Sequence, residues 1–181
     1  MSAQADENES AGEILPRRRD ETPADAAFRF ALFCLSRPPG EDFAFLDPSV
    51  RDMLLRQQFQ GQIAGYRAQF PQARHQILEI EQLPIGRVVV DLDADALQIV
   101  DLAIMPEWRC RGIGARLLRA LVREARAAGV PARFHSFLHN VDGNRLFLRL
   151  GFAPIARTEL QIVWESHGDA EPAIRHAPAR P

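Results

Sequence analysis

The sequence predicts an α/β (α+β) fold in which helices cover both faces of a central, mostly antiparallel sheet of six or seven strands. Apolar, β-branched runs of strand length follow one another between residues 75 and 105. Two helical patterns precede these runs, and two more alternate with strand patterns after them. With 181 residues and 46% hydrophobic content, the chain can bury one core. We therefore expect one domain over 12–166, between mobile ends at 1–11 and 167–181.

The first 70 residues predict one short strand and two helices. A Thr or Asp residue followed by proline is a typical helix start, and the pairs Thr22-Pro23 and Asp47-Pro48 both match it. Proline within the first strand confines that strand to an edge or an early position. The expected elements are, in order, a strand at 13–19, a helix at 22–36 and a helix from 47 to just before Pro71.

The middle of the chain predicts an antiparallel meander, and the rest alternates helices with strands. Alternation along the third strand of the meander places Gln98 and Val100 on the face opposite to Asp101. The expected meander strands are 75–81, 86–92 and 96–105, separated by Pro84 and by the acidic turn 93–95. The later elements are expected to be a helix at 112–128, a strand at 132–137, a helix at 141–150 and two closing strands.

The loop Arg109-Cys110-Arg111-Gly112-Ile113-Gly114 predicts an anion site between a strand and a helix. Glycines let the backbone approach a phosphate, and the helix start offers unpaired N–H groups and a favourable dipole. The loop lacks the lysine and the Ser or Thr of a P-loop, and it lacks the three spaced glycines of a dinucleotide fold. Its pattern is R-x-x-G-x-G. A plain tight connection remains the alternative interpretation.

The R-x-x-G-x-G loop and the helix that follows it resemble the acetyl-CoA signature of the GNAT family of N-acetyltransferases. A second block, Asn140 to Phe152, resembles the N-x-x-A-x-x-L-Y-x-x-L-G-F helix and strand of that family. The resemblance implies a GNAT fold with a splay between the fourth and fifth strands, acetyl-CoA as the acyl-donor substrate, and an amine acceptor. The donor-binding residues that it implies are Ala103, Ile104, Arg109, Cys110, Arg111, Gly112, Ile113, Gly114, Ala115, Asn140 and Phe147.

Three positions depart from the family pattern. Phe147 stands where the family has a tyrosine that commonly protonates the departing CoA thiolate, and phenylalanine cannot do this. Cys110 replaces a glycine that is frequent in the loop, and a small side chain is tolerated there if its φ is negative. In the same way, Gln98 stands where many relatives have a catalytic Glu or His, and glutamine cannot act as a base.

Three residues are candidates for the catalytic chemistry: Asp101, His135 and Tyr66. Asp101 is a charged residue in an apolar strand, and it matches an acid found beside the acetyl group in GNAT enzymes that act on polyamines and similar amines. A carboxylate satisfied by a neighbouring arginine or by the backbone is the equally weighted alternative. An imidazole can accept and donate a proton near neutral pH, which makes His135 a candidate, although a histidine without catalytic duty is the commoner case. Tyr66 is the only tyrosine.

The composition narrows the classes of function. A net charge of −2 argues against a general binder of nucleic acid or of anionic membranes. The longest apolar runs are too short to span a membrane and the acidic start does not match a signal peptide, so we expect a cytoplasmic protein. Two cysteines give no metal spacing.

The main hypothesis is an acetyl-CoA-dependent N-acetyltransferase that acts by direct attack of a primary amine on the thioester. The acceptor is expected to be a small molecule or a peptide, and the enzyme a monomer or homodimer. The alternative is a catalytically weak or inactive CoA-binding module of the same fold, used as a sensor or to bind a partner.

Overall fold

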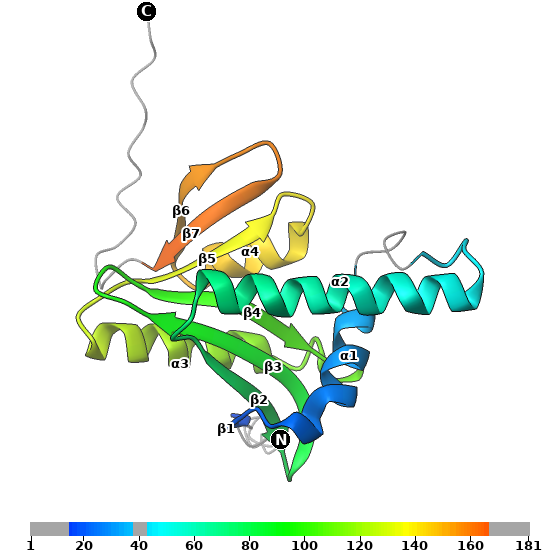
Figure 1. Ribbon diagram of the computed structural model, residues 1–181. Helices are drawn as coiled ribbons and strands as arrows, with labels where there is room; N and C mark the ends of the chain where they lie inside the picture. The colour runs from blue at the N-terminus through cyan, green and yellow to red at the C-terminus, as the bar shows by residue number, and fades with distance from the viewer. Residues whose placement is uncertain (1–14, 38–42, 167–181) are drawn as a thin grey trace, which may run out of the picture.

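The computed structural model describes residues 15–37 and 43–166, which form one seven-stranded sheet with helices on both faces (Figure 1). The strand order is β1-β2-β3-β4-β5-β7-β6, and all neighbours in this sheet are antiparallel except β4 and β5. The predicted fold class is confirmed. The two expected mobile ends, and residues 13 and 14 of the expected first strand, lie outside the described residues.

The strands and helices follow the predicted order. None of the helices in the described part of the chain is long and apolar enough to cross a membrane. The elements are β1 (Arg17–Asp20), the 3-10 turn η1 (Pro23–Asp25), α1 (Ala26–Leu35), α2 (Pro48–Gln69), β2 (Arg74–Ile80), β3 (Leu83–Leu92), β4 (Leu97–Ile104), the 3-10 turn η2 (Pro106–Trp108), α3 (Ile113–Ala127), β5 (Ala132–Phe137), α4 (Val141–Arg149), β6 (Phe152–Arg157) and β7 (Gln161–Ser166).

The core divides between the two faces of the sheet. On one face, α3 buries Leu117, Leu118 and Leu121, which recur at helical spacing, and α4 packs beside it through Phe147. On the other face lie α1 and α2 (Figure 1). The ring of Phe59 in α2 contacts two phenylalanines of α1. This second layer covers the sheet where β4 and β5 diverge, and so it forms one wall of the candidate site.

Pro84 does not separate two strands, as the sequence suggested, because β3 begins before it. Glu81 and Gln82 both have positive φ, 51° and 67°, and form a tight turn between β2 and β3. Pro84 pairs with Glu79 where the register of the two strands shifts. A proline at a bulge removes no regular ladder hydrogen bond, so the strand tolerates it there.

Arg19 of β1 joins the start of α1 to the sheet. Its guanidinium binds both oxygens of Asp25, at 2.7 and 2.8 Å, and Glu79 Oε1 at 2.6 Å. Asp25 and Glu79 are only 6% and 7% exposed. Asp25 also accepts hydrogen bonds from the N–H and the hydroxyl of Thr22, which explains the helix start predicted at this point. The orientation of α1 therefore depends on this ion pair.

Arg19→Met is expected to lower the free energy of unfolding at neutral pH by about 3 kcal/mol, because two buried carboxylates lose their cation. Pairing with Arg19 lowers the pKa of Asp25 below its ordinary value of 3.8, so the stabilisation is present above that value and is lost as the pH falls. The difference in urea midpoint between variant and wild type should therefore shrink in acid. Arg17→Met, exposed on the same strand, is the control. An equal loss at neutral and acid pH would contradict the assignment.

Candidate active site

β4 and β5 separate part of the way along their length, and a cavity opens between them. Their register joins them only from Leu97 to Ile99 of β4. Beyond Ile99, β5 remains paired with β7, whereas no strand within residues 15–37 and 43–166 pairs with the facing edge of β4. The cavity has a volume of about 980 Å³ and is lined by residues 98–103 of β4, residues 134–137 of β5, and side chains from α1 and α2. The splay implied by the resemblance is present.

A β-bulge at Val100 determines which β4 side chains enter the cavity. The register with β3 slips by one residue after Ile99, so that Val100 is an extra residue. Gln98 and Asp101 therefore lie opposite two β3 residues that are two positions apart and share a face. The prediction that they face opposite sides is wrong, because simple alternation does not hold through the bulge. Both residues line the cavity.

Asp101 is held at the cavity wall by Arg87 of β3. Arg87 Nη1 donates to Asp101 Oδ2 at 3.0 Å, Nε donates to Glu21 Oε2 at 2.9 Å, and Nη2 lies 2.9 Å from Nδ1 of His75. Arg87 is only 5% exposed, whereas the Asp101 side chain is 22% exposed. Burial raises the pKa of Asp101 although Arg87 opposes the shift. Asp101 is thus paired with an arginine and also a stronger base than an ordinary carboxylate.

Sequence reasoning did not find the groups that surround Asp101. Arg87, Glu21 and His75 come from β3, from the segment after β1, and from β2, so no local pattern connects them. Arg29 of α1 extends this network by pairing with Glu21. The one available signal is Arg87 itself, a charge beside a run of three valines in a buried strand.

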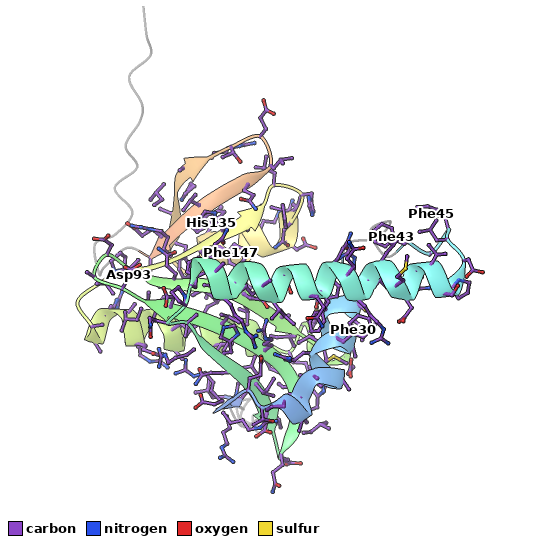
Figure 2. All side chains as sticks on the ribbon, viewed as in Figure 1. Phe30, Phe43, Phe45, Asp93, His135 and Phe147 are labelled. Atoms are coloured by element: carbon purple, nitrogen blue, oxygen red, sulfur yellow. The ribbon has the colours of Figure 1, made fainter. Side chains whose placement is uncertain are left out.

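Tyr66 and His135 reach the same cavity from α2 and β5. Burial and the negative charge of Asp101 raise the pKa of Tyr66, so its phenol stays protonated and available as a donor. His135 is exposed, and Figure 2 places it with Phe147 on the β5 and α4 side of the molecule. The structure therefore brings the three catalytic candidates to one cavity. His139 instead stacks on Phe137, with ring centroids 5.2 Å apart.

The predicted phosphate loop leads into an uncapped helix N-terminus. Gly112 is the N-cap of α3, has a φ of 74°, and provides no side chain to cap the helix. The N–H groups of Ile113, Gly114 and Ala115 belong to the first helical turn, where no intrahelical acceptor exists. These N–H groups and the helix dipole favour an anion at this position.

The arginines around the loop have different environments. Arg109 donates to the carbonyl of Ile104 at 2.8 Å, so it orders the end of β4. The guanidinium of Arg111 lies 4.9 Å from the ring centroid of Trp108. Arg116, which the sequence analysis did not single out, has guanidinium atoms within 4.0 Å of the position of a Cβ at Gly112. Its place one helical turn after Gly112 is the signal that could have identified it.

The block from Asn140 to Phe152 positions Phe147 and contributes to the wall of the cavity. Asn140 Oδ1 accepts the N–H of Gly143 at 3.2 Å, and a Cβ at Gly143 would collide with the Asn140 side chain. Asn140 therefore caps α4, although it also lines the cavity. Phe147 packs edge-on against Phe134, with centroids 4.6 Å apart, and borders the cavity as well.

Cys110 has a φ of 58°. A side chain was expected to be tolerated at this position only with a negative φ, so the cysteine lies in left-handed backbone that favours glycine. We expect Cys110→Gly to raise the free energy of unfolding by roughly 0.5 to 1 kcal/mol, because relief of left-handed strain exceeds the entropy cost of glycine. Urea denaturation measures the change. Arg111→Gly, at a neighbour without positive φ, should be destabilising. If both variants lose stability equally, Cys110 is not strained.

Solved structures of acetyltransferases share this fold. The chain is similar to the PaiA N-acetyltransferase of Thermoplasma acidophilum in complex with coenzyme A, with a TM-score of 0.62, 14% identity, and coverage of 84% of this chain and 99% of that one. The chain is also similar to an acetyltransferase from Thermus thermophilus, with a TM-score of 0.61 and 20% identity, over 84% of this chain and 96% of that one. A third similar structure is a GNAT family acetyltransferase from Elizabethkingia anophelis with acetyl-CoA bound. Its TM-score is 0.52 and its identity 15%, over 83% of this chain and 96% of that one.

The family itself follows from the sequence comparison. A search of the curated proteins gave no match. The model of the Acetyltransferase (GNAT) family matches residues 40–152, which is more than half of the chain. This match includes β4, the glycine loop before α3, and α4, which border the cavity and the predicted anion site. The chain therefore belongs to the GNAT family of acetyltransferases.

Proposed function

We propose that this protein transfers the acetyl group of acetyl-CoA to a primary amine of a small molecule or peptide by direct attack. The observation that carries the proposal is that one open strand edge connects the cavity with the predicted phosphate loop. The open edge of β4 runs from Asp101 in the cavity to the phosphate loop at the start of α3. A thioester placed along this edge has a base at one end and an anion site at the other.

The donor end of this edge suits acetyl-CoA. Membership of the GNAT family supports this donor, as do the structural neighbours with coenzyme A and acetyl-CoA bound. The first turn of α3 would hold the pyrophosphate, with Arg116 beside it. The pantetheine arm would pair with the edge of β4, and a backbone N–H near Ala103 or Ile104 would stabilise the charge that develops on the thioester oxygen.

The acceptor end of this edge supplies the proton chemistry. The amine must be neutral to attack, and Asp101, with its raised pKa, takes the proton. The nitrogen lone pair forms the new C–N bond, the C–S bond breaks, and its electron pair leaves with sulfur. Phe147 has no proton to give to the thiolate. The phenol of Tyr66, which is protonated and lines the same cavity, supplies this proton directly or solvent does. His135 is a second group in the cavity able to move protons.

A CoA-binding module without catalysis is the second candidate function. The ion pair between Arg87 and Asp101 favours it, because a paired carboxylate can be purely structural. Gln98 and Phe147, which replace an expected base and an expected acid, point the same way. In either case we propose a cytoplasmic protein that acts as a monomer or homodimer.

Two measurements separate the candidates. Acetyl-CoA should raise the melting temperature of the protein, because a ligand that binds only the folded state stabilises it. Release of free CoA thiol should then be followed with a panel of amines, amino acids and peptides. Stabilisation together with amine-dependent thiol release supports the transferase. Stabilisation without release for any acceptor supports the module, and no stabilisation at millimolar acetyl-CoA excludes both.

A further inference from the structure

Aromatic side chains gather in the cavity. The chain has 11 Phe, two Trp and one Tyr, and seven of these 14 residues line it. Three of the seven come from β5 and α4, on the side of the cavity that borders the core of α3 and α4. The other four come from α1, from α2 and from the residue that ends α2. They form an aromatic wall that consists of Phe33, Phe59, Tyr66 and Phe70.

The aromatic wall covers the same face of the sheet as Asp101. The next residue, Leu102, packs against the core cluster of α3, so Asp101 lies on the opposite face, where α1 and α2 are (Figure 1). Phe59, Tyr66 and Phe70 recur at helical spacing and therefore share one side of α2. Burial and then the negative charge of Asp101 raise the pKa of Tyr66, which agrees with a position near this carboxylate. The aromatic wall thus begins beside the proposed base.

The aromatic wall leaves apolar surface open to the cavity. Phe59 is only 6% exposed and supports the wall from behind, with its ring centroid 5.4 Å from that of Phe33. Phe33, Tyr66 and Phe70 are half-buried. Apolar surface in contact with water is unfavourable, so a ligand that covers it is bound more tightly. Aromatic rings gain more from edge-on or offset contact with another ring than from burial alone.

The polar lining of the cavity suits one ammonium group and not two. Asp101 is the only carboxylate among the described residues that line the cavity. The side chains beside the aromatic wall include three neutral amides, Gln62 and Gln69 of α2 and Gln98 of β4. The amino group that reacts would face Asp101. A second ammonium group would meet amides and rings, and a charge that loses its water without a partner is costly.

The arginines that line the cavity have partners within the protein. Arg29 and Arg87 both bind Glu21. The guanidinium of Arg37 lies 5.2 Å from the ring centroid of Phe33, so this arginine extends the aromatic wall. The half-buried rings are therefore the feature of this side of the cavity that best separates one acceptor from another.

We propose that the acceptor is a primary amine that carries an aromatic ring, with the ring against Tyr66 and Phe70 and the amino group facing Asp101. This inference rests on the proposed transferase function and specifies its substrate class. It predicts selection against amines with a charge at the other end, because that charge would lose its water against the aromatic wall.

The test compares acceptors of similar length that differ at the end away from the amine. Thiol release from acetyl-CoA is measured with phenethylamine, hexylamine, hexamethylenediamine and ε-aminocaproic acid. The value of kcat/KM for phenethylamine should exceed those for the diamine and the acid by about tenfold or more, and it should also exceed that for hexylamine. If any of the other three acceptors is used as well as phenethylamine, the inference is overturned while the transferase stands.

Phe70→Ala tests whether the aromatic wall causes this preference. The variant should lower kcat/KM for phenethylamine by about tenfold, chiefly through KM, and should leave turnover of hexamethylenediamine unchanged. Phe70→Leu, which keeps an apolar side chain, should retain part of the preference. An equal loss for every acceptor would mean that Phe70 is merely structural and would contradict the inference. Phe45→Ala is the matched control, because Phe45 is 79% exposed and lies near the start of α2, outside the cavity lining (Figure 2).

A binding measurement keeps the inference testable if no acceptor turns over or if Phe70→Ala does not fold. CoA is added first to fill the donor site. N-acetylphenethylamine should then raise the melting temperature of the wild-type protein more than the mono-N-acetyl derivative of hexamethylenediamine does. Absence of all turnover excludes the transferase. The inference about the ring is in that case supported by stronger stabilisation with the aromatic compound and overturned by equal stabilisation.

Discussion

Gly112→Asp is expected to abolish detectable binding of acetyl-CoA, with a loss of affinity of roughly a hundredfold or more, about 2.7 kcal/mol. The new carboxylate would lie where the pyrophosphate is expected, at the N-cap of α3. A Cβ at this position is 3.7 Å from a guanidinium nitrogen of Arg116, so the aspartate would also compete for that arginine. Titration calorimetry with acetyl-CoA measures the loss.

Gly129→Asp is the matched control for this variant. Gly129 follows the other end of α3, has a φ of 78°, and a Cβ there would meet nothing within 4 Å. Both variants place an aspartate in left-handed backbone beside the same helix, so they share the cost in stability. Only Gly112→Asp should lose acetyl-CoA. Similar affinities in the two variants would remove the loop from donor binding.

Asp101→Asn is expected to lower kcat by about a hundredfold to ten-thousandfold while the affinity for acetyl-CoA is unchanged. Asparagine retains an oxygen that can accept the Arg87 hydrogen bond at this position, but it cannot take a proton. The measurements are steady-state thiol release with a productive acceptor and calorimetric binding of acetyl-CoA. Asp95→Asn, in the exposed turn between β3 and β4, should have wild-type kcat.

The pH dependence provides a second readout for Asp101. Because burial raises its pKa above 3.8, the carboxylate is protonated at a higher pH than an ordinary aspartate. The base form is therefore lost as the pH falls through the raised pKa, and kcat of the wild type should fall with it. This acid limb should disappear in Asp101→Asn. A limb that persists in the variant would assign the titration to another group.

The sequence predicted well what short stretches of chain determine. The glycine turn before α3 and the start of α4 at Asn140 were recognisable as local structure because their glycines, cap and apolar spacing act within one or two helical turns. The start of α2 was predicted for the same reason, since Asp47 accepts the N–H of Ser49 two residues later. The first helix began as predicted too, but through the short turn η1 rather than directly.

The parts that were missed depend on contacts between distant segments. Arg87 binds Glu21 across 66 positions and Asp101 across 14, and neither spacing leaves a pattern in the sequence. The bulge at Val100 lies in a run of apolar residues where alternation is hard to follow, so the face of Gln98 was assigned wrongly. Pro84 was taken as a boundary because only the paired structure shows that it lies at a register shift.

The bulge in β4 means that pairing with β3, and not alternation along the sequence, sets which side chains of β4 face the cavity. Asp101 and Ala103 lie opposite Val89 and Arg87, whereas Leu102 lies opposite Val88 in the core layer with α3. If β4 paired with β3 in regular register through Val100, without the bulge, Asp101 would lie opposite Val88 and the phase of the strand would be inverted from there onward. The carboxylate would then point into the hydrocarbon layer and a leucine into the cavity. The bulge at Val100 thus decides which residues reach the cavity, and strands of relatives should be compared with this one by their pairing with the neighbouring strand before any residue in them is given a role.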